Sequence, residues 1–320
     1  MSKQKVELLS PAGNLEKLKI AIKYGADAVY GGVSHFSLRI RASKEFTYET
    51  FKEAIDYAHE RGKKVYATIN GFPFNSQIEL LKTHIKKMAE LKPDAFIVAA
   101  PGVVRLCREI APQIDIHLST QANVLNYLDA QVFWDMGVKR IVVAREISLK
   151  DVMEIKKHLP DMEIEIFVHG SMCFAYSGRC LISAVQMGRV PNRGSCANDC
   201  RFEYTLYAGN DEHGSLFRLE EEPGVGTYIF NSKDMNLASH IQEILDSGAV
   251  DSLKIEGRTK SPYYAAVTAK AYREAIDDYY ENKFDASKYQ KELHSTKNRG
   301  FTDAYLIHKP FEKTDSQNHD

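Results

Sequence analysis

Four of the five cysteines lie close together in the sequence and could bind a metal or an iron–sulfur cluster. Cys173, Cys180, Cys196 and Cys200 follow the spacing C-x6-C-x15-C-x3-C, which matches neither a zinc ribbon nor a ferredoxin. Thiolates are soft ligands that suit tetrahedral zinc or an iron–sulfur cluster. The alternative is a set of unconnected, buried thiols, which fits Cys107 on the apolar face of a predicted helix. Because dense clusters of reduced cysteines usually bind metal, we expect a metal centre and leave its identity open.

Glu165 and His169 are candidate catalytic residues at the end of a predicted strand. Side chains alternate along a strand, so positions 165, 167 and 169 are expected on one face. A carboxylate and an imidazole there could act as acid and base or bind a polar substrate. A buried Glu–His pair that braces the following loop fits the same pattern. The sequence contains neither H-E-x-x-H nor G-x-S-x-G, which disfavours common peptidase mechanisms.

Further polar residues follow other predicted strands and are candidates for substrate binding. Gln121 and Asn123 follow the fifth strand, and Lys254, Glu256 and Arg258 alternate at the end of the eighth. Polar groups that converge at strand ends would form a pocket for a carboxylate or phosphate ligand. Lys254 and Glu256 could instead form ion pairs with neighbours inside a barrel.

Short apolar runs alternate with amphipathic stretches along the chain, which predicts an α/β fold. The predicted strands are Val6–Leu9, Ala28–Gly31, Lys64–Ile69, Ala95–Val98, Asp115–Leu118, Arg140–Val143, Glu163–Val168 and Ser252–Ile255. The predicted helices are Leu15–Tyr24, Tyr48–Arg61, Leu80–Leu91, Val103–Ile110, Leu128–Met136, Leu149–His158, Ala238–Ser247 and Tyr263–Tyr280. Eight strands favour a (β/α)8 TIM-like barrel over a doubly wound sheet, and its active site would lie at the carboxyl ends of the strands.

A Cys-rich insertion interrupts this alternation after strand seven. Residues 170–231 are too many for an ordinary loop and contain four of the five cysteines, with a hairpin-like region at 202–230. We expect a barrel domain over residues 1–309 that includes this insertion. Residues 310–320 are polar and are expected to form a disordered tail or a linker to a further domain.

The composition excludes several classes of protein. Apolar residues make up 44% and charged residues 27%, and 42 basic residues balance 43 acidic ones, so bulk charge would not hold nucleic acid. No apolar stretch approaches the roughly 20 residues of a membrane span, and the start has no secretion segment, so a cytoplasmic protein is expected. Local positive charge that could contact RNA comes from Arg39, Arg41, Arg179, Arg189, Arg193 and Arg201.

The segment from residue 165 to 201 resembles the signature of the peptidase U32 family, the collagenase-like peptidases. The matching residues are Glu165, Phe167, His169-Gly170, Met172-Cys173, Ser177-Gly178-Arg179-Cys180, Ser183, Asn192-Arg193-Gly194 and Cys196. Further matching stretches are Leu8–Asn14, Asp27–Gly32, Ser119–Gln121 and Lys254–Arg258. The resemblance implies a barrel-like domain and a [4Fe-4S] cluster held by Cys173, Cys180, Cys196 and Cys200.

The resemblance also implies a reaction and its alternatives. Some relatives act in oxygen-independent hydroxylation of RNA, and the reaction expected here converts the tRNA wobble uridine to 5-hydroxyuridine with prephenate, a small carboxylate, as oxygen donor. Ser177, Arg179 and Lys254, with Glu165 and His169, would position substrate or donor. The alternatives are a collagenase-like peptidase, hydroxylation of ubiquinone precursors, and a cluster-bearing scaffold that needs a partner subunit. The tRNA-modifying relatives usually continue into a small C-terminal β domain, so this chain is either a short member or a truncated one.

Overall fold

Eight parallel strands form a closed barrel at the centre of the molecule. The computed structural model describes residues 5–33, 36–38, 46–202, 204–205, 207–210, 214–218 and 233–307. The barrel strands are β1 (Glu7–Pro11), β2 (Ala28–Gly31), β3 (Lys64–Ile69), β4 (Ala95–Val98), β5 (Asp115–Leu118), β6 (Arg140–Val142), β7 (Glu163–Ser171) and β11 (Ser252–Ile255). Each pairs with the next along the chain, and β11 closes the ring because it pairs with both β7 and β1. The predicted (β/α)8 barrel is confirmed.

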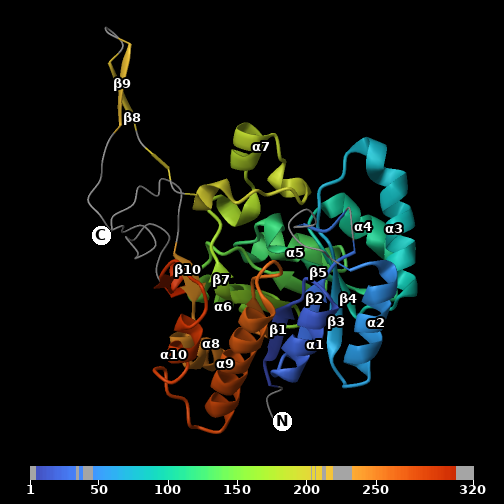
Figure 1. Cartoon of the computed structure of the whole chain (residues 1–320). Helices are drawn as coiled ribbons and strands as arrows, with labels where there is room; N and C mark the ends of the chain where they lie inside the picture. Colours follow the sequence, from blue (N-terminus) through green and yellow to red (C-terminus); the bar gives the residue numbers. More distant parts are fainter. Residues whose placement is uncertain are drawn as a thin grey trace.

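Helices surround the barrel and connect its strands (Figure 1). They are α1 (Leu15–Lys23), α2 (Tyr48–His59), α3 (Ile78–Glu90), α4 (Pro101–Ile110), α5 (Tyr127–Asp135), α6 (Leu149–His158), α8 (Ile241–Asp246) and α9 (Pro262–Tyr280). Side chains of Asn14, Thr47, Asn126, Ser148 and Ser261 cap five of these helices by accepting from backbone amides of the first turn. Such caps satisfy amides that have no partner within the helix, so the sequence itself defines where these helices begin.

Two apolar cores stabilise the fold. The larger core lies between strands and helices and includes Phe51, Ile85, Phe96 and Ile276. The smaller core fills the barrel with Leu9, Ala28, Tyr30, Tyr66, Ala95 and Ile97. Alternation along each strand produces both cores, because neighbouring residues face opposite sides of the barrel wall.

The chain leaves the barrel after β7 and returns through short elements, of which the sequence predicted only the hairpin, within its hairpin-like region at 202–230. After β7 come the short helix α7 (Ile182–Met187) and an antiparallel hairpin of β8 (Tyr207–Asn210) and β9 (Ser215–Arg218). Strand β10 (Asp234–Asn236) then pairs antiparallel with the end of β7, and β12 (Phe301–Thr302) pairs with β10. The last helices are α10 (Gln290–His294) and α11 (Ala304–Ile307). Residues 219–232 and the expected tail at 310–320 lie outside the described residues.

Within the described ranges, no helix combines the length and the apolar character that crossing a membrane requires.

Candidate active site at the barrel mouth

A pocket opens at the carboxyl ends of the barrel strands, where the sequence places the active site. It brings together five of the predicted substrate-binding residues: Gln121, Ser177, Lys254, Glu256 and Arg258. The other residues that line it are Tyr30, Leu38, Thr68, Asn70, Ile97, Ser119, Thr120, Val142, Arg145, Phe167, Ser171, Cys173, Gly178 and Arg201. A polar rim therefore surrounds a floor of barrel side chains.

Positive charge dominates this pocket. Lys254, Arg145, Arg201 and Arg258 line it, whereas Glu256 is the one acidic lining residue among those that the structure describes. The Lys254 ammonium lies 4.4 Å from the centre of the Tyr30 ring, and the Arg145 guanidinium lies 4.0 Å from that of Phe167. A pocket of this composition suits an anionic ligand, and guanidinium groups match carboxylates or phosphates in geometry.

Arg258 is held rigidly at the pocket edge. Its Nη1 donates to Ser37 Oγ at 2.8 Å and to Thr68 Oγ1 at 3.1 Å, and its Nη2 donates to the carbonyl oxygen of Leu38. These hydrogen bonds tie the loop after β11 to the loop after β2 and to β3, which places a cation at a fixed position on the rim.

Gln121 supplies an unused hydrogen-bond donor to the pocket. Its side chain is 3% exposed, and its Oε1 accepts from Ser119 Oγ at 3.2 Å. Within the described part of the chain, nothing accepts a hydrogen bond from its Nε2. A buried amide normally satisfies its donors, so this group is suited to a ligand oxygen.

Asn123 and Arg179 lie beside the pocket but outside its lining. Asn123 adopts a left-handed backbone conformation and its Nδ2 donates to the carbonyl oxygen of Tyr176 at 3.4 Å. Arg179 Nε donates to the carbonyl oxygen of Gln121 at 3.3 Å. Both residues therefore tie the segment after β7 to the loop after β5.

Glu165 lies beneath the pocket floor in a buried ionic network rather than at the mouth. Its carboxylate is fully buried and accepts from Lys254 Nζ at 2.7 Å and from Arg140 Nη1 at 3.2 Å. Burial lowers the pKa of Lys254, although attraction to Glu165 opposes this shift. The alternative that the sequence left open, pairing of Lys254 inside the barrel, is the observed arrangement.

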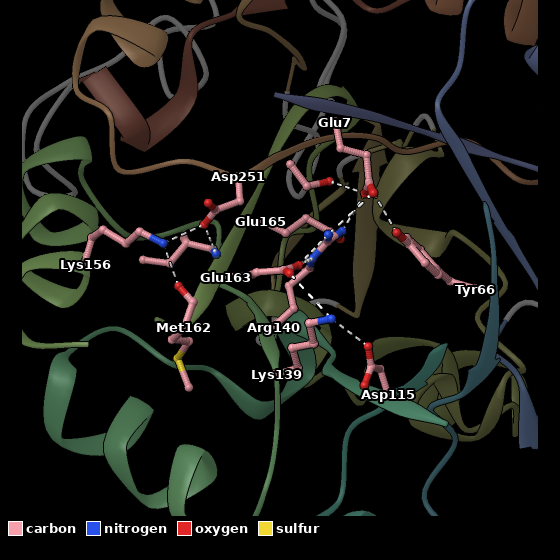
Figure 2. A network of polar contacts seen from close by, with 12 residues as sticks. Glu7, Tyr66, Asp115, Lys139, Arg140, Lys156, Met162, Glu163, Glu165 and Asp251 are labelled. Carbon is pink, nitrogen blue, oxygen red and sulfur yellow. Dashed lines mark hydrogen bonds and ion pairs between the residues drawn. The ribbon is translucent and has the colours of Figure 1, made fainter. Parts of the chain in front are cut away.

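The network continues to the amino-terminal end of the barrel through Arg140 (Figure 2). Arg140 bridges Glu165, Glu163 and Glu7, and its Nη1 lies 2.5 Å from Glu7 Oε1. Glu7 also accepts from Tyr66 at 2.6 Å and from Ser252 at 3.0 Å. Burial would raise the pKa of Glu7, but attraction to Arg140 and these hydrogen bonds outweigh it and lower that pKa. The Glu7 carboxylate is thereby stabilised in its charged form.

His169 points away from the pocket, so the expectation that it shares a face with Glu165 is wrong. The register between β7 and β11 shifts after Lys254, which pairs with Phe167, whereas Ile255 pairs with His169. This irregularity adds one residue to β7 and reverses the alternation beyond Phe167. His169 is buried among Tyr264, Tyr272 and Phe301, with Nδ1 3.3 Å from the Tyr272 hydroxyl. The predicted acid–base pair therefore does not assemble at the pocket.

The four clustered cysteines line one cavity beside the barrel pocket. Cys173, Cys180, Cys196 and Cys200 are all partly exposed free thiols, whereas Cys107 is buried on α4. Three residues line both cavities: Leu38, Cys173 and Gly178. The cysteine cavity and the barrel pocket therefore share a wall.

Four cysteine thiols form a donor set whose chemistry suits a metal centre. Among the residues that the structure describes, no three His, Cys, Asp or Glu side chains are close enough to hold one ion. Zinc would need all its thiolates within about 2.3 Å of one point, whereas a [4Fe-4S] cluster takes four thiolates on separate irons. The Ile182 amide donates to Cys180 Sγ at 3.4 Å, a contact that stabilises a thiolate. Burial raises the pKa of the Cys180 and Cys200 thiols, so deprotonation would need a bound cation.

A family model described as Peptidase family U32 matches residues 13–316 of this chain. The chain belongs to peptidase family U32. The U32 match covers every barrel strand except β1, whose range Glu7–Pro11 precedes it, and it includes all four cysteines of the cavity.

Relatives of this U32 chain carry different functional names. It is 72% identical to "tRNA hydroxylation protein P" of Helicobacter pylori, over 98% of this chain and 74% of that protein. It is 42% identical to the Escherichia coli protein of the same name, over 94% of this chain and 74% of that one. A "Collagenase" of Porphyromonas gingivalis is 31% identical, over 94% of this chain and 73% of that protein. A solved U32 peptidase structure aligns with a TM-score of 0.50 at 16% identity, over 80% of this chain and 95% of that one, which bears on the fold alone.

Several pocket residues of this U32 chain were missed by sequence reasoning. Tyr30, Thr68, Ser119 and Ser171 line the pocket although none was a predicted site residue. The first three lie at or just beyond the ends of predicted strands, at positions that face the inside of the barrel. The alternation of side chains along each strand could therefore have identified them as pocket residues. Ser171 lies three residues beyond the predicted end of its strand at Val168, so the predicted pattern did not extend to it. Among the arginines expected near the mouth, Arg39 and Arg41 lie outside the described residues.

Proposed function

We propose that this chain is a cytoplasmic iron–sulfur enzyme that hydroxylates tRNA without molecular oxygen. The proposed reaction converts the wobble uridine to 5-hydroxyuridine with prephenate as oxygen donor. The observation that carries the proposal is the shared wall between the cavity with four cysteines and the cationic pocket at the barrel mouth. The similarity to proteins named for tRNA hydroxylation supports the same reaction class.

The proposed cofactor is a [4Fe-4S] cluster bound by Cys173, Cys180, Cys196 and Cys200. Such a cluster would supply one-electron chemistry next to the pocket. Phe174 and Pro191 also line the cysteine cavity and would limit access of water. Zinc is the alternative occupant, and its binding would make the site structural.

The cationic pocket would hold the carboxylate donor. Arg145 and Arg258 are placed to pair with carboxylates, and the free donor of Gln121 could bind a further oxygen. Lys254 contributes positive charge at the floor while Glu165 and Arg140 fix its position from below. Phe167 and Tyr30 provide apolar surface for a ring. A partner subunit could supply electrons or complete the binding site for RNA.

A collagenase-like peptidase is the second candidate, because a relative with that name shares most of this chain. The described geometry disfavours Glu165 as its acid or base. That carboxylate is fully buried and bonded to two cations, so water and a peptide would not reach it.

The experiment is mass spectrometry of tRNA nucleosides from a strain that lacks this gene. We expect 5-hydroxyuridine and its derivatives to disappear and to return when the wild-type gene is restored. Complementation with Arg258→Gln should restore little modification, because the variant loses a cation of the pocket, whereas Arg105→Gln on the outer helix α4 should restore it fully. Unchanged nucleosides in the deletion strain, together with gelatin cleavage by the purified protein, would establish the peptidase instead.

A further inference from the structure

The segment between β7 and the β8–β9 hairpin has a charge balance unlike the rest of the chain. Residues 172–202, here called the rim segment, contain four arginines and a single acidic residue, Asp199. Asp199 is 2% exposed and accepts a hydrogen bond from Ser183, so it contributes little negative charge to the surface. Over the whole chain, by contrast, 42 basic and 43 acidic residues nearly cancel. The rim segment is therefore a local cationic surface on a neutral protein.

Large apolar side chains are exposed among these arginines. Tyr176 is 47% exposed and Phe202 is 49% exposed. The other exposed apolar residues of the rim segment are Phe174, Leu181, Val185, Met187 and Val190. Figure 1 shows α7 projecting beyond the end of the barrel wall that carries the pocket. Exposed apolar groups gathered on one short segment indicate a binding surface.

The rim segment is fixed to the edge of the barrel pocket. Ser177 lines the pocket and adopts a left-handed backbone conformation with φ of 40°. Its amide donates to Glu146 Oε1 at 2.7 Å, and its hydroxyl donates to Glu146 Oε2 at 2.5 Å. Asn123 holds the preceding carbonyl group. The ring of Tyr176 therefore extends from an anchored backbone next to the pocket.

We propose that the rim segment binds unpaired nucleotides of RNA and presents one of them to the pocket. In this arrangement Arg179 and Arg189 contact phosphates, and Tyr176 and Phe202 stack on bases. Single-stranded RNA is recognised by this combination of arginines and exposed aromatic rings, since every base has a face on which a ring can stack. A basic surface without aromatic rings would suit duplex RNA equally well, so the aromatic residues are the reason for choosing an unpaired loop. The inference rests on the proposed function and identifies the part of the chain that would hold its substrate.

The stacking role is tested by substituting Tyr176 and measuring binding of a tRNA transcript to the full chain. Tyr176→Leu keeps an apolar side chain but removes the ring, and we expect about 10-fold weaker binding at constant salt, the usual effect of one lost stacking contact. Tyr176→Phe keeps the ring and should bind as the wild type does. The matched control is Tyr24→Leu, since Tyr24 is an exposed aromatic residue at the far end of α1.

The phosphate contacts are tested by salt titration of the same complex. The double variant Arg179→Gln/Arg189→Gln should reduce the slope of log K against log salt by about 1.4, or roughly 0.7 for each contact with single-stranded RNA. The corresponding double lysine variant keeps both charges and should retain the slope. Arg105→Gln on α4 removes one charge from a distant exposed position and should leave the slope unchanged.

Two outcomes would overturn the inference. The first is wild-type affinity and slope in the Tyr176 and arginine variants. The second is equal affinity of the wild type for a tRNA anticodon loop and for a fully paired RNA of the same length. Failure of the proposed function would look different, because 5-hydroxyuridine would then persist in the deletion strain whatever the rim variants do to RNA binding. If the rim segment bound a protein instead of RNA, none of these substitutions would change the affinity of the chain for RNA, which is the first of these outcomes.

Discussion

At the scale of single residues, the buried amide of Gln121 makes the most direct prediction about the pocket. Gln121→Leu removes a donor that nothing accepts in the described structure, and it also removes the acceptor of the Ser119 hydroxyl, so the folded state should lose only about 1 kcal/mol. Its substrate affinity should fall by about 10-fold or more, as expected for a hydrogen bond to a charged oxygen. The measurement is the dissociation constant of prephenate, together with the free energy of unfolding in urea.

Two variants serve as controls for this residue. Gln121→Glu places a negative charge in the same position and should weaken prephenate binding further than leucine does. Gln131→Leu on α5 replaces an exposed amide that donates to Asp135 of the same helix. It should change neither the affinity for prephenate nor the free energy of unfolding much. A Gln121→Leu variant that binds prephenate with wild-type affinity but unfolds at a markedly lower urea concentration would contradict the prediction. Gln121 would then stabilise the fold and not bind the ligand.

At the scale of elements, β7 explains why the sequence placed Glu165 and Phe167 on one inward face correctly and misjudged His169. Alternation is reliable while the register is constant, and it places both residues inside the barrel. One extra residue before His169 reverses the pattern, and no residue type in Phe167-Val168-His169 marks that position. The antiparallel strand β10 pairs with this same end of β7, so a tertiary contact decides the geometry. Local pattern reasoning has no access to such a contact.

The rim segment carries the four cysteines, so the prediction about the cofactor belongs to this element. Protein purified without oxygen should be brown and contain about four iron atoms per chain, since the four cysteines face one cavity. Cys200→Ser should lose most of this iron. Cys107→Ser provides the control, because Cys107 is buried on α4 away from the cavity and should keep the iron. Colourless wild-type protein that contains one zinc would refute the cluster.

At the scale of the whole molecule, the sequence was sufficient to predict the barrel but not the ionic network inside it. Five predicted strands, among them 64–69 and 252–255, coincide with the observed ones because apolar runs between caps and glycines define them well. Glu7, Arg140 and Glu165 come from three separate strands, so their network forms only when the barrel closes. The sequence offered no means of distinguishing a carboxylate that braces the barrel from one that acts on substrate.

Folding also buries His117 against Tyr66 inside the barrel and His169 against the α9 tyrosines, which makes stability depend on pH. Burial lowers the pKa of His169 to about 4 and that of His117 well below its ordinary value. The unfolded chain therefore binds more protons than the folded one between about pH 6.5 and pH 4, and stability falls as the pH decreases through this window. For His169 alone the loss is roughly 2 kcal/mol between pH 6.5 and pH 5.

The test is to measure the free energy of unfolding in urea for the wild type and for His169→Gln at pH 7 and pH 5. The variant should be less stable at pH 7, because the side chain packs against Tyr272 and two further rings. At pH 5 the difference should shrink by roughly 2 kcal/mol, since the variant has no imidazole to protonate at this position. Ile276→Val, in the α9 core, removes a buried methylene without any titrating group and should show the same destabilisation at both pH values. A difference for His169→Gln that stays constant with pH would mean that His169 is not held neutral in the folded protein.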